Sequence, residues 1–270
     1  TMTDLSASEL QGIKREMVHR HIAWLTALRY QLREDRPWEM HLKKGRSSLG
    51  FKAAHYRIRE EEISMEDKLK KYLSETDYNA IISKGNKASQ ILGIQSRRLR
   101  ELMEQGLIED FRHMEMQAML TEFFTLQGKA ERIKNFPYPR QFATLNYIFV
   151  WIFILLLPLG MMHEFEKIGY EVVDAIQAHM LVHTSPFHPL VEFVGKYFIW
   201  FSVPFTIVVS WIFHTMERIG ENTENPFEGN SNDVPITTMS RGIEIDIREM
   251  IGDDSNLIPK PLEPQYDIQM

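Results

Sequence analysis

The chain has 270 residues, enough for one large domain or two small ones. It contains no cysteine, which excludes a disulfide framework, a thiolate metal site and a cysteine nucleophile. The formal net charge of −6 argues against nucleic acid as a partner of the whole chain. The mean hydropathy of −0.28 is that of a soluble protein, but the apolar residues are concentrated in two segments.

The part of the chain before the first apolar segment predicts helices. Residues 10–34 place apolar side chains at helical spacing, whereas residues 41–63 are charged and irregular and predict a solvated loop with one short helix at most. Asn86 as an N-cap and Gly106 as the residue after the last turn bracket a further helix. Residues 107–134 predict the next helix. Its apolar residues on one face are Phe111, Met114, Ala118, Met119, Phe123, Leu126, Ala130 and Ile133.

Two uncharged segments are long enough to cross a lipid bilayer. Residues 141–163 contain no Asp, Glu, Lys or Arg, and neither do residues 197–216. As a helix the first segment is about 35 Å long, and the hydrocarbon core of a bilayer is about 30 Å thick. A buried core helix or a run of parallel strands is the alternative, but a core helix rarely stays uncharged on every side for about six turns. The sequence therefore predicts two transmembrane helices.

Basic residues flank the first segment on one side. The four that precede it are Lys129, Arg132, Lys134 and Arg140. Residues 164–167, which follow it, contain two glutamates and a single lysine. Positive charge favours the cytoplasmic side of a membrane. We therefore predict that residues 1–140 form a cytoplasmic helical domain, that residues 164–196 form an extracytoplasmic connection and that residues 217–270 are cytoplasmic.

The last part of the chain predicts an exit loop, one helix and an extended tail. Polar residues rich in oxygen ligands follow the second apolar segment directly, at positions 221–233. Ser240 is a candidate N-cap for a helix that Gly252 closes. The tail from Leu257 contains three prolines, which favour an extended backbone over a helix.

Two acid-x-x-His pairs are candidate metal ligands. Glu16 precedes His19 and Asp110 precedes His113, a spacing that bundle proteins with two iron ions use. Further donors would be Glu109, Glu115 and Glu122. Such pairs also arise by chance among 37 acidic residues and 10 histidines, so surface polar residues are the favoured interpretation. Because no nucleophile motif or phosphate-binding glycine loop accompanies them, we predict that the chain is not an enzyme.

A row of small polar residues runs along the second apolar segment. Ser202, Thr206 and Ser210 are spaced four apart, and His214 extends the row. Such a row either lines a water-filled path or marks close packing between membrane helices, and we favour packing. Neither apolar segment carries an ionisable residue near its middle, which argues against a proton relay or a voltage sensor.

Several segments together resemble a bacterial member of the bestrophin family of ion channels. They are residues 22–33, 132–143, 155–160, 224–229 and 232–235. The most specific of these is the Asn-Pro-Phe sequence at positions 225–227, just after the last membrane segment. The resemblance implies an all-α membrane protein with two transmembrane helices here and a cytoplasmic helical bundle.

The resemblance also implies a function and partners. Bestrophins are homo-oligomeric, pentameric channels that chiefly conduct chloride and other anions, so the expected partners are the lipid bilayer, inorganic ions and further copies of the chain. The expected location is the bacterial inner membrane. Family members have four membrane helices per subunit, so this chain would lack the first two, including the helix that lines the narrow pore neck. A membrane-anchored helical scaffold or sensor without transport activity is the alternative, and a bundle metalloenzyme comes third.

The family's calcium-binding clasp uses the Asn-Pro-Phe loop and an acidic cluster after it. By position, Asn222, Asn225 and Asp233 are the residues of this chain that match the clasp. Residues 230–232 are Asn, Ser and Asn, where animal members have aspartates. The missing negative charge should weaken calcium binding, so we expect no cofactor.

Overall fold

A computed structural model of the chain describes residues 6–34, 59–136, 140–178, 188–222, 226–227, 229, 233–265 and 268–269. Over these residues the regular secondary structure is helical, and the sole β-type pairing among them is an isolated bridge between Gln265 and Ile268. The chain divides into two compact units. The helical unit comprises Thr1–Pro137 and Asn225–Met270, and the hairpin unit comprises Tyr138–Glu224.

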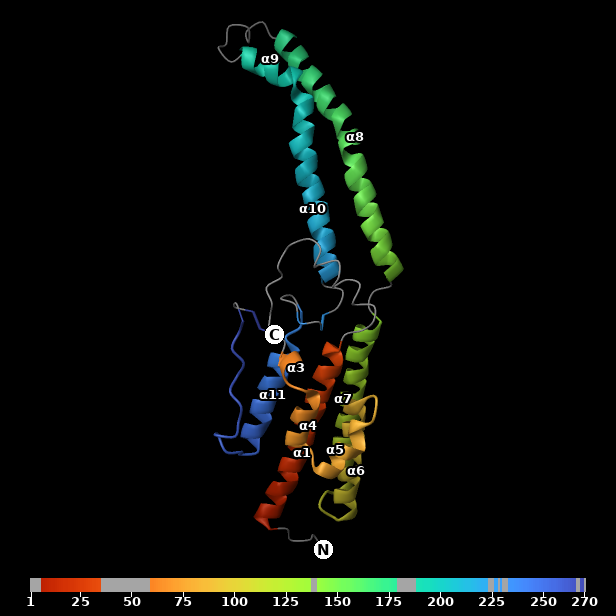
Figure 1. The fold of residues 1–270 in the computed structure, drawn as a ribbon, viewed down its shortest axis with the longest axis vertical. Coiled ribbons are helices and arrows are strands. Elements are labelled where there is room, and N and C mark those ends of the chain that lie inside the picture. The colour runs from red at the N-terminus through yellow and green to blue at the C-terminus, as the bar shows by residue number, and fades with distance from the viewer. Residues whose placement is uncertain are drawn as a thin grey trace. The chain divides into compact units, whose positions relative to one another are not determined.

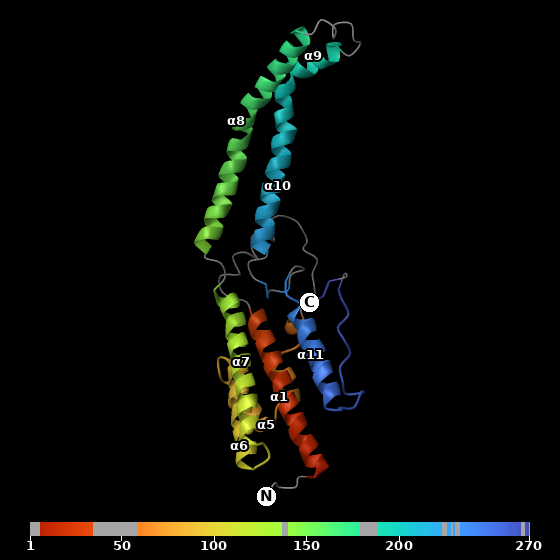
Figure 2. The same ribbon diagram turned by 180° about the vertical axis from the view of Figure 1, so that it is seen from behind.

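The helical unit is built around its first helix. Its helices are α1 (Ala7–Arg33), α3 (Arg59–Glu62), α4 (Met65–Tyr72), α5 (Glu75–Ile82), α6 (Lys87–Glu104), α7 (Asp110–Asn135) and α11 (Ile236–Met250). In both views α1 lies between the α6–α7 pair and α11 (Figures 1 and 2). The residues before and after the hairpin unit, which the sequence analysis assigned to one compartment, therefore fold together as one unit.

The short helices α4 and α5 were not predicted from the sequence. Each has eight residues, too few for a clear apolar period. Both begin at a serine whose hydroxyl accepts a backbone hydrogen bond, Ser64 from the N–H of Asp67 and Ser74 from that of Asp77. These caps are the local signal that could have revealed the two helices.

Both ends of α6 confirm the prediction from sequence. The side chain of Asn86 accepts a hydrogen bond from the backbone N–H of Ser89 at 2.9 Å. After the last turn, Gly106 has a φ of 71°, a left-handed conformation that glycine adopts without steric cost. The local chemistry of the two residues therefore fixes where this helix begins and ends.

The predicted start of the last helix was wrong. The sequence predicts an N-cap at Ser240, but α11 begins at Ile236, directly after Pro235. Proline favours the start of a helix because its φ is already helical and its missing N–H needs no partner there. The predicted end is confirmed, since Gly252 follows α11 with a φ of 70°.

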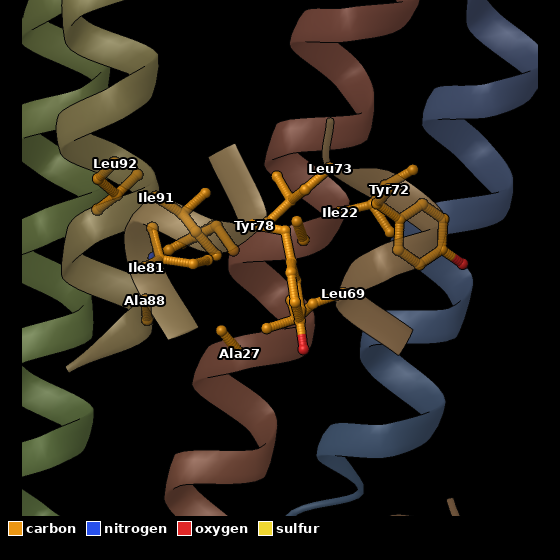
Figure 3. Close-up of a cluster of buried hydrophobic side chains, with 12 residues drawn as sticks. Ile22, Ala27, Leu69, Tyr72, Leu73, Tyr78, Ile81, Ala88, Ile91 and Leu92 are labelled. Carbon is orange, nitrogen blue, oxygen red and sulfur yellow. The ribbon is translucent and has the colours of Figure 1, made fainter. Parts of the chain in front are cut away.

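The core of the helical unit lies where α1, α4, α5 and α6 meet (Figure 3). Its buried residues are Ile22, Ala23, Trp24, Ala27, Leu69, Tyr72, Leu73, Tyr78, Ile81, Ala88, Ile91 and Leu92. Leu69 is fully buried, and Ile81 and Ile91 are 1% exposed. Burying one such side chain contributes about 1.5–3 kcal/mol to stability, so this cluster holds the short helices against α1.

A buried polar network attaches α7 to the core. The indole Nε1 of Trp24 donates to Oε1 of Gln127 at 2.8 Å, and Gln127 is only 2% exposed. Its Nε2 donates in turn to the Ser89 hydroxyl at 2.9 Å and to the Glu131 carboxylate at 2.8 Å. Because a buried polar group without a partner is costly, this network fixes the register of α7 against α1 and α6.

The hairpin unit consists of two long helices joined at one end by shorter ones (Figure 1). Its elements are α8 (Arg140–Ala178), α9 (His188–Lys196), the 3-10 helix η1 (Phe198–Phe201) and α10 (Ser202–Asn222). Two stretches are long and apolar enough to cross a membrane, Thr144–Ala175 and Phe198–Gly220, with mean hydropathies of 2.1 and 1.5 in their most apolar windows. α8 continues well past the end of the predicted apolar segment at His163.

The two long helices pack through aromatic and small side chains. The rings of Phe153 and Phe213 are 4.6 Å apart, and the Phe165 ring lies 5.4 Å from that of Phe205. Ser202 is 3% exposed, and its hydroxyl donates to the backbone carbonyl of Ile199 at 2.6 Å. The beginning of the small polar row is therefore buried within the hairpin unit, as the packing interpretation predicts.

We expect Gly169→Ala to destabilise the hairpin unit. A Cβ at Gly169 would lie 2.5 Å from the backbone oxygen of Gly195, and backbone cannot rotate away as a side chain can. Overpacking of this kind costs about 1–3 kcal/mol. The matched control is Gly160→Ala in the same helix, where a Cβ meets nothing within 4 Å. Thermal unfolding followed by circular dichroism in detergent should show a lower Tm for Gly169→Ala only; equal Tm values would contradict the contact.

Candidate functional site

The long helices of the hairpin unit expose large apolar side chains. Leu155 is 73% exposed, Leu159 67%, Trp211 66% and Phe149 63%. An apolar surface of this size is unfavourable in water and typical of contact with lipid or with other membrane helices. A buried core helix, the alternative from sequence, is wrong for both stretches, since 0% and 11% of their most apolar windows are buried.

The loop after α10 is fastened to the end of α1. Phe227 is 8% exposed, and its backbone carbonyl accepts a hydrogen bond from the Arg33 guanidinium at 2.9 Å. The Val234 N–H donates to the Pro226 carbonyl at 2.9 Å, which closes the loop. Gly229 has a φ of 91°, a conformation that side chains rarely allow. The loop containing the Asn-Pro-Phe sequence thus has a defined conformation at its described residues.

A charged cluster, the exit-loop clamp of Arg29, Arg33, Glu60 and Thr237, lies beside this loop. Glu60 Oε1 is 2.7 Å from Arg29 Nε and accepts a hydrogen bond from the Thr237 hydroxyl at 2.9 Å. The side chains of Arg33 and Glu60 are each 4% exposed. Burial lowers the pKa of the Arg33 guanidinium, and the carboxylates of Glu60 and Asp233 counteract that shift. The clamp joins α1, α3, the exit loop and the start of α11.

The structure describes two of the three predicted calcium ligands. Asn222 is the last residue of α10, and Asn225 lies outside the described residues. The carboxylate of Asp233 accepts a hydrogen bond from the Gly229 N–H at 2.8 Å, so it helps to shape the exit loop. Over the part of the chain that the structure describes, no group of three or more His, Asp or Glu residues could hold a metal ion. The calcium ligand set stays a prediction.

A second buried charge cluster, the Asp253 cluster of Arg15, His19, Arg248 and Asp253, joins the two ends of the helical unit. The Asp253 side chain is 1% exposed, and its carboxylate lies 2.9 Å from Nε of Arg15 and 2.9 Å from Nε of Arg248. Burial by itself raises the pKa of Asp253, but the hydrogen bonds from Arg248 and Arg15 outweigh it and hold the pKa below its usual value. Asp253 is therefore a buried, paired carboxylate.

Glu16 and His19, the first acid-x-x-His pair, contact different partners. Glu16 forms ion pairs with Arg20 at 2.6 Å and with Arg98 at 3.2 Å. His19 Nε2 instead lies 3.9 Å from Asp253, and burial, followed by the Arg248 charge, lowers the His19 pKa. In this structure Glu16 and His19 therefore belong to separate ion pairs that join α1 to other elements.

Sequence reasoning missed the buried pair of Tyr72 and Glu244. The Tyr72 hydroxyl donates to the Glu244 carboxylate at 2.6 Å, and burial and this hydrogen bond raise the pKa of Tyr72 above its usual range. Arg241 and Arg248, one turn on either side along α11, lie 3.1 and 3.6 Å from the same carboxylate. The regular spacing of the three α11 residues is a sequence signal, but their partner on α4 is 172 residues away from Glu244.

The fold and the exposed apolar helices define an all-α membrane protein. The sequence model of the protein family described as "Bacterial/Fungal Bestrophin protein" matches residues 2–182 and 185–249 of the chain. The chain belongs to this family, as the resemblance from sequence predicted.

Curated relatives and solved structures agree with this membership. The voltage-dependent anion channel-forming protein YneE of Escherichia coli K12 is 23% identical over 199 residues, 74% of this chain and 54% of YneE. Protein RSc3414 of Ralstonia nicotianae, which carries the same description, is 24% identical over 58% of this chain. The chain thus spans about half the length of these relatives, 54% and 40%. A crystal structure of a bestrophin homolog from Klebsiella pneumoniae shares the fold, with a TM-score of 0.58 and 19% identity over 90% of this chain and 68% of that one.

Proposed function

We propose that the chain is a subunit of a homo-oligomeric, pentameric ion channel that conducts chloride or other anions across the bacterial inner membrane. The observation that carries the proposal is the pairing of a lipid-type helical hairpin with a helical unit, in a family whose curated relatives are named anion channel-forming proteins. The same names favour a channel over an enzyme. The alternative is a membrane-anchored scaffold without transport activity, and it predicts that the protein carries no ions across a membrane.

A pore lined by the two long helices of this chain requires several copies of it. The hairpin unit contributes two long helices, and the uncharged segments 141–163 and 197–216 within them carry no ionisable residue near the middle. Two such helices cannot enclose a water-filled path, because each exposes apolar side chains on most of its surface. Homo-oligomerisation is therefore part of the proposal.

The outer face of α7 supports assembly with a second copy of the chain. The helix packs inward through Leu120 and Phe123. The face that the sequence analysis singled out points mostly away from this core: its exposed members are Phe111 (68%), Met114 (60%), Met119 (56%), Ile133 (50%) and Leu126 (47%). We infer that a second copy covers this face, because an apolar stripe over six turns of a helix outside the membrane segments is unfavourable in water.

The proposed topology places the helical unit in the cytoplasm and residues 164–196 on the opposite side of the membrane. The chain contains no cysteine, so a single introduced cysteine is a clean reporter. We expect Lys84→Cys in the helical unit and Ala175→Cys near the end of α8 to react with a membrane-impermeant maleimide from opposite sides. Labelling of both positions from the same side of intact inverted vesicles would contradict this arrangement.

Ion flux from proteoliposomes tests the function directly. We expect the full-length protein to release trapped chloride faster than protein-free vesicles do. The rate should not change when calcium is chelated, because residues 230–232 lack the carboxylates of the animal clasp. If the protein forms an intact oligomer but passes no anion, the channel function is contradicted and the membrane-anchored scaffold is favoured. Passage of cations in place of anions would keep the channel and overturn its proposed selectivity.

A further inference from the structure

A shallow groove lies between α6 and α7 in the helical unit, apart from both charge clusters. Its volume is about 370 Å³, and it is lined by Gly93, Ser96, Arg97, Arg100, His113 and Gln117. A Cβ added at Gly93 would meet nothing within 4 Å, so the absence of a side chain there leaves open space. The volume falls in the range of sites for small molecules, about 300–1,000 Å³, and is far more than one chloride ion needs.

The groove is basic although the chain as a whole is acidic. Two guanidinium groups and one imidazole line it, and no carboxylate is among the lining residues. The Arg97 side chain has no ion pair or hydrogen bond to any residue that the structure describes. Arg100 pairs with Glu104 at 3.4 Å, but both side chains are more than 60% exposed, and such a pair is worth only about 0.3–0.5 kcal/mol. Both guanidinium groups are thus available to an anion.

The amide of Gln117 adds a polar group to the groove floor. Its Nε2 is 2.6 Å from the Ser96 hydroxyl, and its Oε1 is buried with no hydrogen-bond partner among the described residues. The hydrogen bond to Ser96 therefore links Gln117 of α7 to α6 beside the groove.

We propose that the α6–α7 groove binds a small, multiply charged anion of the phosphate or phosphate-ester class. Arg97 and Arg100 are spaced i, i+3 on one face of α6, and guanidinium groups bind phosphate oxygens through paired N–H donors. His113, the histidine of the second acid-x-x-His pair, lies at this groove as a polar wall. The proposal does not depend on channel activity.

Calorimetric titration with inorganic pyrophosphate tests the proposal on the full chain in phosphatidylcholine nanodiscs. We expect saturable binding that Arg97→Gln and Arg100→Gln each weaken about tenfold, the loss of one charge-assisted hydrogen bond of about 1.4 kcal/mol. The matched charge control is Arg112→Gln on α7, which lies outside the lining, is 69% exposed and pairs with Glu115 at 2.7 Å. It should leave the affinity within twofold.

A side chain that fills the groove distinguishes binding at this site from nonspecific attraction of anions to the basic surface. Gly93→Leu projects a side chain into the open space and should abolish binding, whereas Gly93→Ala adds one methyl group and should retain it. Both changes favour the helix, so neither variant should fail to fold. Binding unaffected by Gly93→Leu, or equally weakened by Arg112→Gln, would overturn the proposal, as would no binding at all.

A second titration distinguishes the source of the phosphate group. Dihexanoyl phosphatidic acid, below its micelle concentration, carries the headgroup of a lipid on a soluble molecule. Tighter binding than pyrophosphate, still lost in Gly93→Leu, assigns the groove to a lipid headgroup. Weaker binding than pyrophosphate assigns the groove to a free phosphorylated molecule. Both results are consistent with a phosphate-binding site in the groove.

Discussion

Asp253→Asn is expected to lower the free energy of unfolding of the helical unit by about 3 kcal/mol, the typical cost of breaking a buried ion pair. The Asp253 side chain is 1% exposed and neutralises Arg248, whose own side chain is 5% exposed. Without the carboxylate, the ion-pair partner that Arg248 retains among the described residues is Glu244, at 3.6 Å. Because Arg15 of α1 binds the same carboxylate, the substitution should also loosen the contact between the two ends of this unit. Chemical denaturation followed by circular dichroism in detergent measures the change.

The matched control is Asp246→Asn, which makes the same change of charge at an exposed position of α11. It should alter stability by less than about 0.5 kcal/mol, as surface substitutions usually do. Equal stability of the two variants would show that the buried pairs around Asp253 contribute nothing.

The effect of Asp253→Asn should depend on pH with a defined sign. The folded pKa of Asp253 lies below its value of about 3.9 in an unfolded chain, so the folded state binds fewer protons. The stability from this carboxylate is therefore present above about pH 4 and is lost as the pH falls through the folded pKa. The difference between the wild type and Asp253→Asn should shrink in that acidic window and stay constant between pH 6 and pH 8.

Met119→Asp and Leu126→Asp are expected to dissociate the proposed oligomer. Both side chains lie on the exposed apolar face of α7, at 56% and 47% exposure, so the subunit itself should fold normally. Between two copies of the chain each new carboxylate would be buried without a partner, which costs several kcal/mol at every interface. Mass photometry in detergent should show single chains for the variants and a homo-oligomer for the wild type.

The control for this experiment is Met250→Asp, an equal change at the exposed end of α11, where the side chain is 83% exposed. It should leave the mass of the oligomer unchanged. A wild-type oligomer whose mass is insensitive to both α7 substitutions would place the subunit interface elsewhere. A wild type that is itself a single chain would contradict the proposed channel assembly.

Local features of this chain could be predicted from its sequence. The two membrane-type helices follow from length and composition, because an uncharged run of about 20 residues has few other stable environments. The ends of α6 follow from Asn86 and Gly106, since a cap bonds within its own turn and a left-handed residue needs no distant partner. The family follows from short segments in a fixed order, which the match over residues 2–182 and 185–249 confirms.

The tertiary structure alone decided which side chains meet. Periodicity identified one apolar face of α7, but of its members the core takes Phe123 at one edge, together with Gln127, which is buried against Trp24, 103 residues away. Asp253 pairs with Arg15 across 238 residues of sequence, and no local pattern marks either residue as half of a buried pair. A helix pattern specifies which residues share a face; the partner of that face, and hence the charge clusters and the groove between α6 and α7, depends on packing between segments far apart in the chain.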